Sequence, residues 1–187
     1  LQAFAKGFSF FGDKLGSLLS TDLTAFEDYV AKEENSCFVE WIDLYYDCEL
    51  TRQGVTLVDT PGADSINARH TGVAFDYIKN SDAILFVTYY NHAFSKADQE
   101  FLIQLGRVKD SFQLDKMFFI INAIDLADNE EEKNNVVDYV KENLIKYGVR
   151  NPHLYPLSSL AALQEKTESL SLLSGMKDFE QAFYNFI

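Results

Sequence analysis

Val55-Thr56-Leu57-Val58-Asp59-Thr60-Pro61-Gly62 is the stretch that decides the fold class of this chain. The first four residues favour β structure and the last two favour a loop, so we expect a buried strand over Val55–Asp59. An aspartate at a strand tip offers Mg²⁺ a hard oxygen ligand. The glycine that follows lets a backbone N–H approach a phosphate oxygen closely. Alone, the same stretch would also suit a strand that simply ends in a turn.

A second stretch, Met117-Phe118-Phe119-Ile120-Ile121-Asn122, predicts another buried strand, and the chain continues with Ala123-Ile124-Asp125. An Asn and an Asp three positions apart, just past a strand tip, can contact a purine from two directions. The carboxylate can accept two N–H bonds from a guanine edge, and the amide can bond the base and tie neighbouring loops together. Both residue types also favour turns. Their position after Asp-Thr-Pro-Gly, with one strand and two helices between, favours the purine interpretation.

These two motifs, in this order, resemble those of GTPases of the Ras-like P-loop class. In detail, Leu50-Thr51-Arg52-Gln53-Gly54 and the residues that follow through Thr71 resemble the second switch region of bacterial dynamin-like proteins. The resemblance continues through Phe118 to Ala127, and covers about residues 37–160.

The resemblance implies a role for particular residues. Asp59 would hold Mg²⁺ through a water, and the Gly62 amide would sense the γ-phosphate. Asn122 and Asp125 would select guanine, and the serines after the last strand would add contacts to the base. The full set of implied nucleotide-binding residues is Asp59, Thr60, Gly62, Asn122, Asp125, Ser158 and Ser159, with Asp59 as the metal ligand. No residue is identified as a catalytic base.

Two departures from the family pattern matter. Most Ras-like GTPases have Lys where this chain has Ala123, which removes apolar area over the guanine. The sequence also holds no Gly-x-x-x-x-Gly-Lys-[Ser/Thr] motif, whose backbone N–H groups and Lys would hold the phosphates. We therefore expect the chain to be the C-terminal part of a GTPase domain, without its phosphate loop. Thr21 and Thr24 are expected to cap helices, Thr24 in a capping box with Glu27.

Composition excludes several other classes of protein. The apolar fraction of 47% indicates a globular chain, and the net charge of −13 argues against a nucleic-acid surface and against docking on anionic lipid. Cys37 and Cys48 lack metal-ligand spacing and are expected to be reduced thiols. No stretch approaches 18 consecutive apolar residues, so no transmembrane helix is predicted. Trp41 is expected in the core.

The predicted fold class is α/β, an incomplete Ras-like P-loop GTPase fold. We expect a mostly parallel sheet with one antiparallel edge strand and helices on both faces. The whole chain, 1–187, is expected to be one partial dynamin-type GTPase domain, with a helical lead-in over 1–35 and an α/β core over 36–187. The predicted strands are Phe38–Glu49 (antiparallel), Val55–Asp59, Ala83–Tyr89, Met117–Asn122 and His153–Leu157; the helices of the core cover about 71–79, 95–108, 130–147 and 175–187.

The resemblance also implies an activity, which we state as an expectation. The intact protein would bind GTP with Mg²⁺ and hydrolyse it, pair with a second GTPase domain, and couple hydrolysis to membrane remodelling or fusion. Membrane contact would come from regions outside this chain, at the inner face of the cell membrane, and the protein would otherwise be cytoplasmic. The alternative is a non-hydrolysing GTPase-like module that serves interaction or dimerisation. The chain alone is expected to be inactive.

Overall fold

The computed structural model describes residues 1–60, 77–107, 116–168 and 174–187. It divides the chain into two compact units, Leu1–Leu57 and Val58–Ile187. The single-domain assignment made from the sequence stays a prediction.

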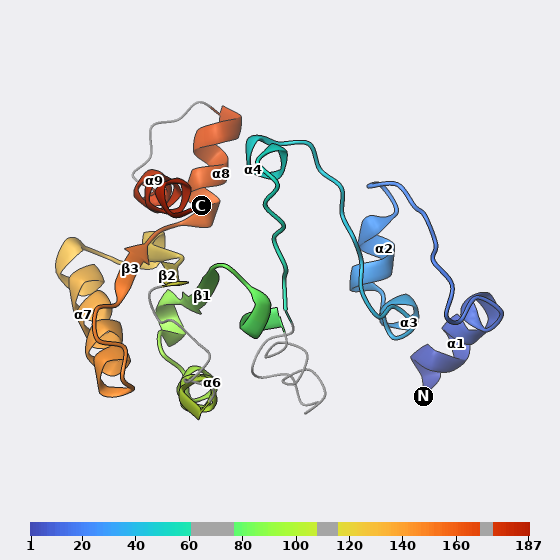
Figure 1. Ribbon diagram of the computed structural model, residues 1–187, viewed down its shortest axis with the longest axis horizontal. Helices are drawn as coiled ribbons and strands as arrows, with labels where there is room; N and C mark the ends of the chain where they lie inside the picture. The colour runs from blue at the N-terminus through green and yellow to red at the C-terminus, as the bar shows by residue number, and fades with distance from the viewer. Residues whose placement is uncertain (61–76, 108–115, 169–173) are drawn as a thin grey trace. The chain divides into compact units, whose positions relative to one another are not determined.

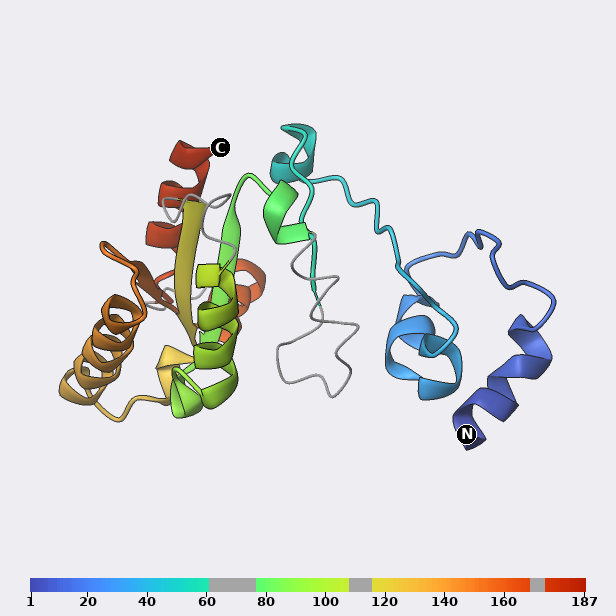
Figure 2. The ribbon, with the colours of Figure 1, turned by 60° about the horizontal axis from the view of Figure 1, so that its bottom comes forward.

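The larger unit is built on a three-stranded parallel sheet in the order β1-β2-β3 (Figure 1). The strands are β1 (Ile84–Tyr89), β2 (Met117–Asn122) and β3 (His153–Pro156). β1 and β2 pair from Ile84↔Met117 to Tyr89↔Asn122, and they run side by side in Figure 2. All five residues from Met117 to Ile121 are buried, as expected for a central strand with both faces covered. The predicted parallel α/β sheet is confirmed.

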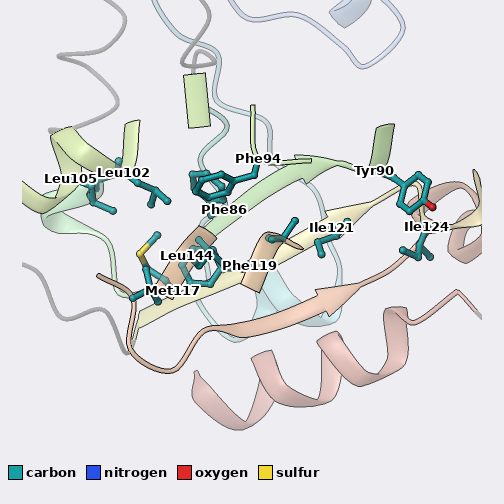
Figure 3. Packing of buried hydrophobic residues seen from close by; sticks show 13 residues of the cluster. Phe86, Tyr90, Phe94, Leu102, Leu105, Met117, Phe119, Ile121, Ile124 and Leu144 are labelled. Carbon is teal, nitrogen blue, oxygen red and sulfur yellow. The ribbon is translucent and has the colours of Figure 1, made fainter. Parts of the chain in front are cut away.

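Two helices, α6 (Lys96–Arg107) and α7 (Glu130–Lys146), lie on one face of the sheet (Figure 1). Figure 3 shows the core that they close, in which Phe86 and Phe119 of the sheet lie near Leu102 and Leu144 of the helices. Leu144 of α7 is fully buried. Burial of these side chains, at about 25 cal/mol per Å² of apolar surface, is the main term that holds the helices on the sheet.

The opposite face is covered by α9 (Met176–Phe186), with α8 (Ser159–Glu168) on the same side (Figure 1). The ring of Phe118 on β2 makes edge contacts with Phe183 at 5.6 Å and Phe186 at 5.4 Å between ring centroids. Gly175 precedes α9 with φ of +73°, and a Cβ there would collide with the Pro156 carbonyl. Only glycine therefore suits this junction.

The helix starts follow predictable capping chemistry. At α6, the Ser95 hydroxyl accepts a hydrogen bond from the Asp98 N–H (3.2 Å), and the Asp98 carboxylate accepts one from the Ser95 N–H (2.8 Å). At α7, the Asn129 side chain accepts a hydrogen bond from the Glu132 N–H (2.9 Å). These bonds satisfy N–H groups that have no partner inside the helix.

The smaller unit, Leu1–Leu57, contains short helices: α1 (Gln2–Phe11), α2 (Phe26–Ala31), α3 (Glu33–Ser36) and α4 (Glu49–Arg52). Its packing is aromatic, and the Phe38 ring stacks on Phe4 and on Phe11, with centroids 4.9 Å and 5.3 Å apart. The helical character predicted for the lead-in is thus present, but α1 ends at Phe11. Leu15 and Leu18 lie beyond this helix and are exposed.

The predicted antiparallel edge strand is not formed. Residues 38–59 are all described and contain no strand, so Phe38–Glu49 and Val55–Asp59 were wrong as strand predictions. Between these two segments the chain forms the helical turn α4, where the Cys48 N–H donates to the Thr51 hydroxyl (3.0 Å). A strand depends on a neighbouring ladder for its backbone hydrogen bonds, and a two-stranded hairpin alone is marginal in water.

Two smaller predictions also fail in this unit. Trp41 is 58% exposed rather than part of the core. Thr24 does not cap α2; its N–H and hydroxyl both donate to the Asp22 carboxylate, which also accepts the Ala25 N–H. Aspartate is the stronger acceptor because it is ionised.

In the larger unit, a helix was predicted over 71–79. Only residues 77–79 of it lie within the described part, and these are helical.

Candidate functional site

The carboxyl ends of β2 and β3 meet at one edge of the sheet. β2 ends at Asn122, and β3 is followed at once by Leu157, Ser158 and Ser159. Parallel strands place these ends together, and ligands of open α/β sheets bind at this edge. Three predicted site residues, Asn122, Ser158 and Ser159, therefore gather here, although Asn122 precedes Ser158 by 36 positions in the sequence.

The side-chain amide of Asn122 connects the two strand ends. Its Oδ1 atom accepts hydrogen bonds from the Ser159 N–H (3.0 Å), the Ser159 hydroxyl (2.9 Å) and the Ala123 N–H (2.8 Å). Because these bonds all use the oxygen, the amide NH₂ is the part of Asn122 that remains to donate to a ligand. The tie between neighbouring loops that the sequence suggested for Asn122 is therefore present.

Ala123 begins the next loop in the left-handed conformation, with φ of 63° and ψ of 38°. This backbone is uncommon for a residue with a Cβ and costs of order 1–3 kcal/mol. Hydrogen bonds hold it in place, since the Ile124 N–H donates to the Leu157 carbonyl (3.2 Å) and the Leu157 N–H to the Ile121 carbonyl (3.0 Å). These bonds fix the backbone direction of the segment Ile124–Leu126 that follows the turn.

Asp125 lies in the short 3₁₀ helix η4 (Ile124–Leu126) that follows this turn. Its neighbour Ile124 is buried in the core, whereas Asp125 is exposed. The carboxylate is thus held on a rigid segment and is accessible to a ligand. That combination is what recognition of a base edge requires, because a preformed acceptor loses little conformational freedom on binding.

The two serines have different environments. Ser158 is 1% exposed; its N–H donates to the Ser174 carbonyl (2.8 Å) and its hydroxyl accepts from the Ala161 N–H (3.0 Å), so it caps α8. Ser159 is exposed and bonded to Asn122. Ser158 is therefore a buried structural residue beneath this edge of the sheet, and Ser159 is part of its exposed surface. Helix α8 was not predicted from the sequence, although a serine before an apolar segment is an ordinary capping signal.

The predicted metal ligand lies apart from these elements in the sequence. Asp59 is exposed and Thr60 half-buried, both in a segment without regular structure, and Gly62 lies outside the described residues. No cluster of three or more His, Cys, Asp or Glu suited to a metal occurs within the described part of the chain. A single carboxylate still fits Mg²⁺, which is usually bound by one or two carboxylates together with phosphate oxygens and waters.

Comparison with known proteins assigns the family. The model of the Dynamin family matches residues 14–124, which is more than half of the 187 residues. The chain belongs to the dynamin family. Dynamin-like protein A of Bacillus subtilis is 51% identical over 151 residues, which cover 81% of this chain and 13% of that protein. A protein of Arabidopsis thaliana named "Probable transmembrane GTPase FZO-like, chloroplastic" is 28% identical over 84% of this chain and 17% of its own length.

The dynamin fold is also found among solved structures. A structure described as an oligomerised bacterial dynamin pair that senses and tethers membranes over long range matches with a TM-score of 0.73 and 21% identity. The match covers 98% of this chain and 35% of the chain in that structure. This dynamin-family chain therefore spans a minor part of the length of the relatives it matches. Among the described residues, no helix has the length and apolar character needed to cross a membrane.

Proposed function

We propose that this dynamin-family protein binds GTP together with Mg²⁺ and hydrolyses it. The observation that carries the proposal is the Asn122 amide, which ties the β2 tip, the Asp125 turn and Ser159 into one preformed edge. Asp125, exposed on η4, would accept the ring N–H and the exocyclic amine of guanine. The relatives named as a dynamin-like protein and as a GTPase support this proposal.

The chemistry would be phosphoryl transfer to water. The water oxygen bonds to the γ-phosphorus, the bond from that phosphorus to the β–γ bridging oxygen breaks, and GDP and phosphate leave. Catalysis of this kind is positioning and charge stabilisation rather than covalent chemistry. Asp59 would hold the Mg²⁺, which when bound supplies positive charge to the phosphate oxygens. Asn122 and Asp125 would orient the nucleotide through its base.

We further propose that hydrolysis is coupled to membrane remodelling or fusion, through pairing with a second GTPase domain. The solved structure described as a membrane-tethering dynamin pair supports this part of the proposal. Contact with lipid would come from segments other than the described residues, since the net charge of −13 repels anionic lipid. The protein would act at the inner face of the cell membrane.

A second candidate is a non-hydrolysing GTPase-like interaction module. Ala123 favours it, because the usual Lys would add contact with the base. The lack of a Gly-x-x-x-x-Gly-Lys-[Ser/Thr] motif in these 187 residues is consistent with it as well. Phosphate release separates the two candidates, because only the first predicts release from GTP by the full-length protein.

The experiment that tests base recognition is Asp125→Asn in the full-length protein. The amide can donate a hydrogen bond where xanthine carries a carbonyl, so the variant should lose GTP affinity and gain xanthosine triphosphate affinity. Loss of hydrogen bonds to a charged group, at about 1.5–3 kcal/mol, predicts GTP binding weaker by roughly ten- to a hundredfold. Titration calorimetry measures both affinities.

Asp138→Asn is the matched control, because Asp138 is an exposed acid on α7, outside the loop that carries Asp125. It removes the same charge without altering the predicted base contact. Unchanged GTP affinity in Asp125→Asn, or an equal loss in both variants, would show that Asp125 does not recognise the base.

A further inference from the structure

Tyr90 is a buried residue to which the proposed function assigns no role. It begins the 3₁₀ helix η1 (Tyr90–His92), directly after β1, and is 5% exposed. Within the described residues its hydroxyl is the one buried side-chain polar atom that makes no hydrogen bond. Leaving a buried hydroxyl unpaired costs about 1–3 kcal/mol, so a phenylalanine would pack here with less cost.

The position of Tyr90 relates it to the Asp125 loop. Figure 3 shows its ring beside Ile124, at the carboxyl end of the sheet, and both side chains belong to the main core cluster. Ile124 immediately precedes Asp125. The segment that presents the Asp125 carboxylate therefore rests on the Tyr90 ring.

The far end of the same loop approaches the Tyr90 hydroxyl. The Glu132 carboxylate accepts a hydrogen bond from the Asp128 N–H (2.9 Å) through Oε2, and the Glu132 N–H donates to Asn129. Burial raises the pKa of the Tyr90 phenol, and the neighbouring carboxylates of Glu132 and Asp128 raise it further. The phenol therefore keeps its proton, and the Glu132 carboxylate, whose other oxygen is Oε1, is a neighbouring acceptor.

We propose that the Tyr90 hydroxyl donates to the Glu132 carboxylate when nucleotide is bound and so fixes the loop that carries Asp125. Tyr90 is then a positioning residue for purine recognition, and this inference rests on the function proposed above. Glu132 already holds the Asp128 N–H, so one further hydrogen bond would connect β1, the loop and the start of α7. The loop is held at its other end by the bonds to Asn122 and Leu157.

The test compares Tyr90→Phe with Tyr147→Phe in the full-length protein. Tyr147 is the matched control because its hydroxyl donates to Gln99 (3.0 Å), so the same atom is removed from a different place in the core. The first readout is hydrogen exchange of the amides of residues 124–128 in the GTP-bound protein. The second is the ratio of affinities for GTP and inosine triphosphate, which lacks the exocyclic amine and so depends less on Asp125.

If Tyr90 positions the loop, Tyr90→Phe should lower the GTP-to-inosine affinity ratio by about three- to tenfold, the range of one hydrogen bond. Exchange of the loop amides should quicken, and Tyr147→Phe should change neither readout. In an Asp125→Asn background, Tyr90→Phe should have no further effect on the ratio. An unchanged ratio with unchanged exchange would overturn the inference, whatever the change in melting temperature. If the wild-type protein binds no GTP, the proposed function fails first, and the inference fails with it.

Discussion

Asn122→Ala should destabilise the larger unit of this chain, because one oxygen atom accepts three hydrogen bonds at the carboxyl edge of the sheet. Each bond contributes about 0.5–1.5 kcal/mol net. Ser159 is exposed, so water replaces part of what its two groups lose. The Ala123 N–H loses the bond that helps to hold a left-handed backbone. Together we expect the free energy of unfolding to fall by about 2 kcal/mol.

Two variants separate the contributions. Asn122→Asp keeps an oxygen that can accept all three bonds, so its stability should stay within about 1 kcal/mol of the wild type. It loses the NH₂ group, however, and should weaken nucleotide binding in the full-length protein. Ser159→Ala removes the hydroxyl bond alone and should cost about 0.5–1 kcal/mol.

The assay must report on the right unit. The chain has a single tryptophan, Trp41, which belongs to the Leu1–Leu57 unit, so tryptophan fluorescence would report on the smaller unit. Hydrogen exchange of the β2 and β3 amides measures the opening free energy of the sheet directly. Equal protection in Asn122→Ala and wild type would refute the reasoning, and so would an equal loss in Asn122→Asp.

The remaining predictions concern packing, pH and nucleotide. Leu144→Ala, at a fully buried position, should cost about 2–5 kcal/mol by denaturant unfolding, whereas Ile145→Ala, half exposed on the same helix, should cost no more than about 0.5 kcal/mol. Burial raises the pKa of Tyr90 and of Tyr155, so the stability that the neutral phenols contribute is present below pH 10 and is lost as the pH rises above it. Unfolding followed from about pH 8 to about pH 11 should show this loss, and either Tyr→Phe variant should reduce it. The 187-residue chain alone should bind a fluorescent GTP analogue poorly, and micromolar affinity would contradict our account of the phosphate contacts.

The sheet was predictable where burial alone decides the structure. The run from Met117 to Ile121 is apolar without interruption, and it is buried on both faces in a central strand. Helix α7 was predictable because acids begin it and its apolar residues recur at helical spacing. In both cases the local preference and the tertiary structure agree, which is the condition under which sequence patterns are reliable.

The segment from Phe38 to Asp59 shows the opposite case. Its aromatic and branched residues favour a strand, yet Trp41 and Tyr45 are exposed and no strand forms. Preference for β structure is a preference for a half-buried, paired surface, and it does not act without a partner strand. The sequence indicates the residues that could pair but not whether a ladder is present.

In the candidate site, too, some features could be predicted from the sequence and others could not. That Asn122 would meet Ser159 follows from two parallel strand ends, and sequence reasoning could place them at one edge. The left-handed backbone of Ala123 and the burial of the Tyr90 hydroxyl could not be predicted, because each depends on bonds or packing with residues distant in sequence. The geometry of the candidate site is therefore set by tertiary contacts to the loop that carries Asp125.

Charge explains why a preformed base edge would not be sufficient for tight binding of GTP. The phosphates carry several negative charges, and this chain adds a net charge of −13. A phosphate loop normally offsets this repulsion with backbone N–H groups and a lysine, and that motif does not occur in these 187 residues. Base contacts contribute about 1.5–3 kcal/mol for each bond to a charged group, which can select guanine but cannot outweigh several unpaired charges. Under the proposed function, Asn122 and Asp125 would therefore determine which nucleotide is bound, and the affinity would depend on groups that face the phosphates.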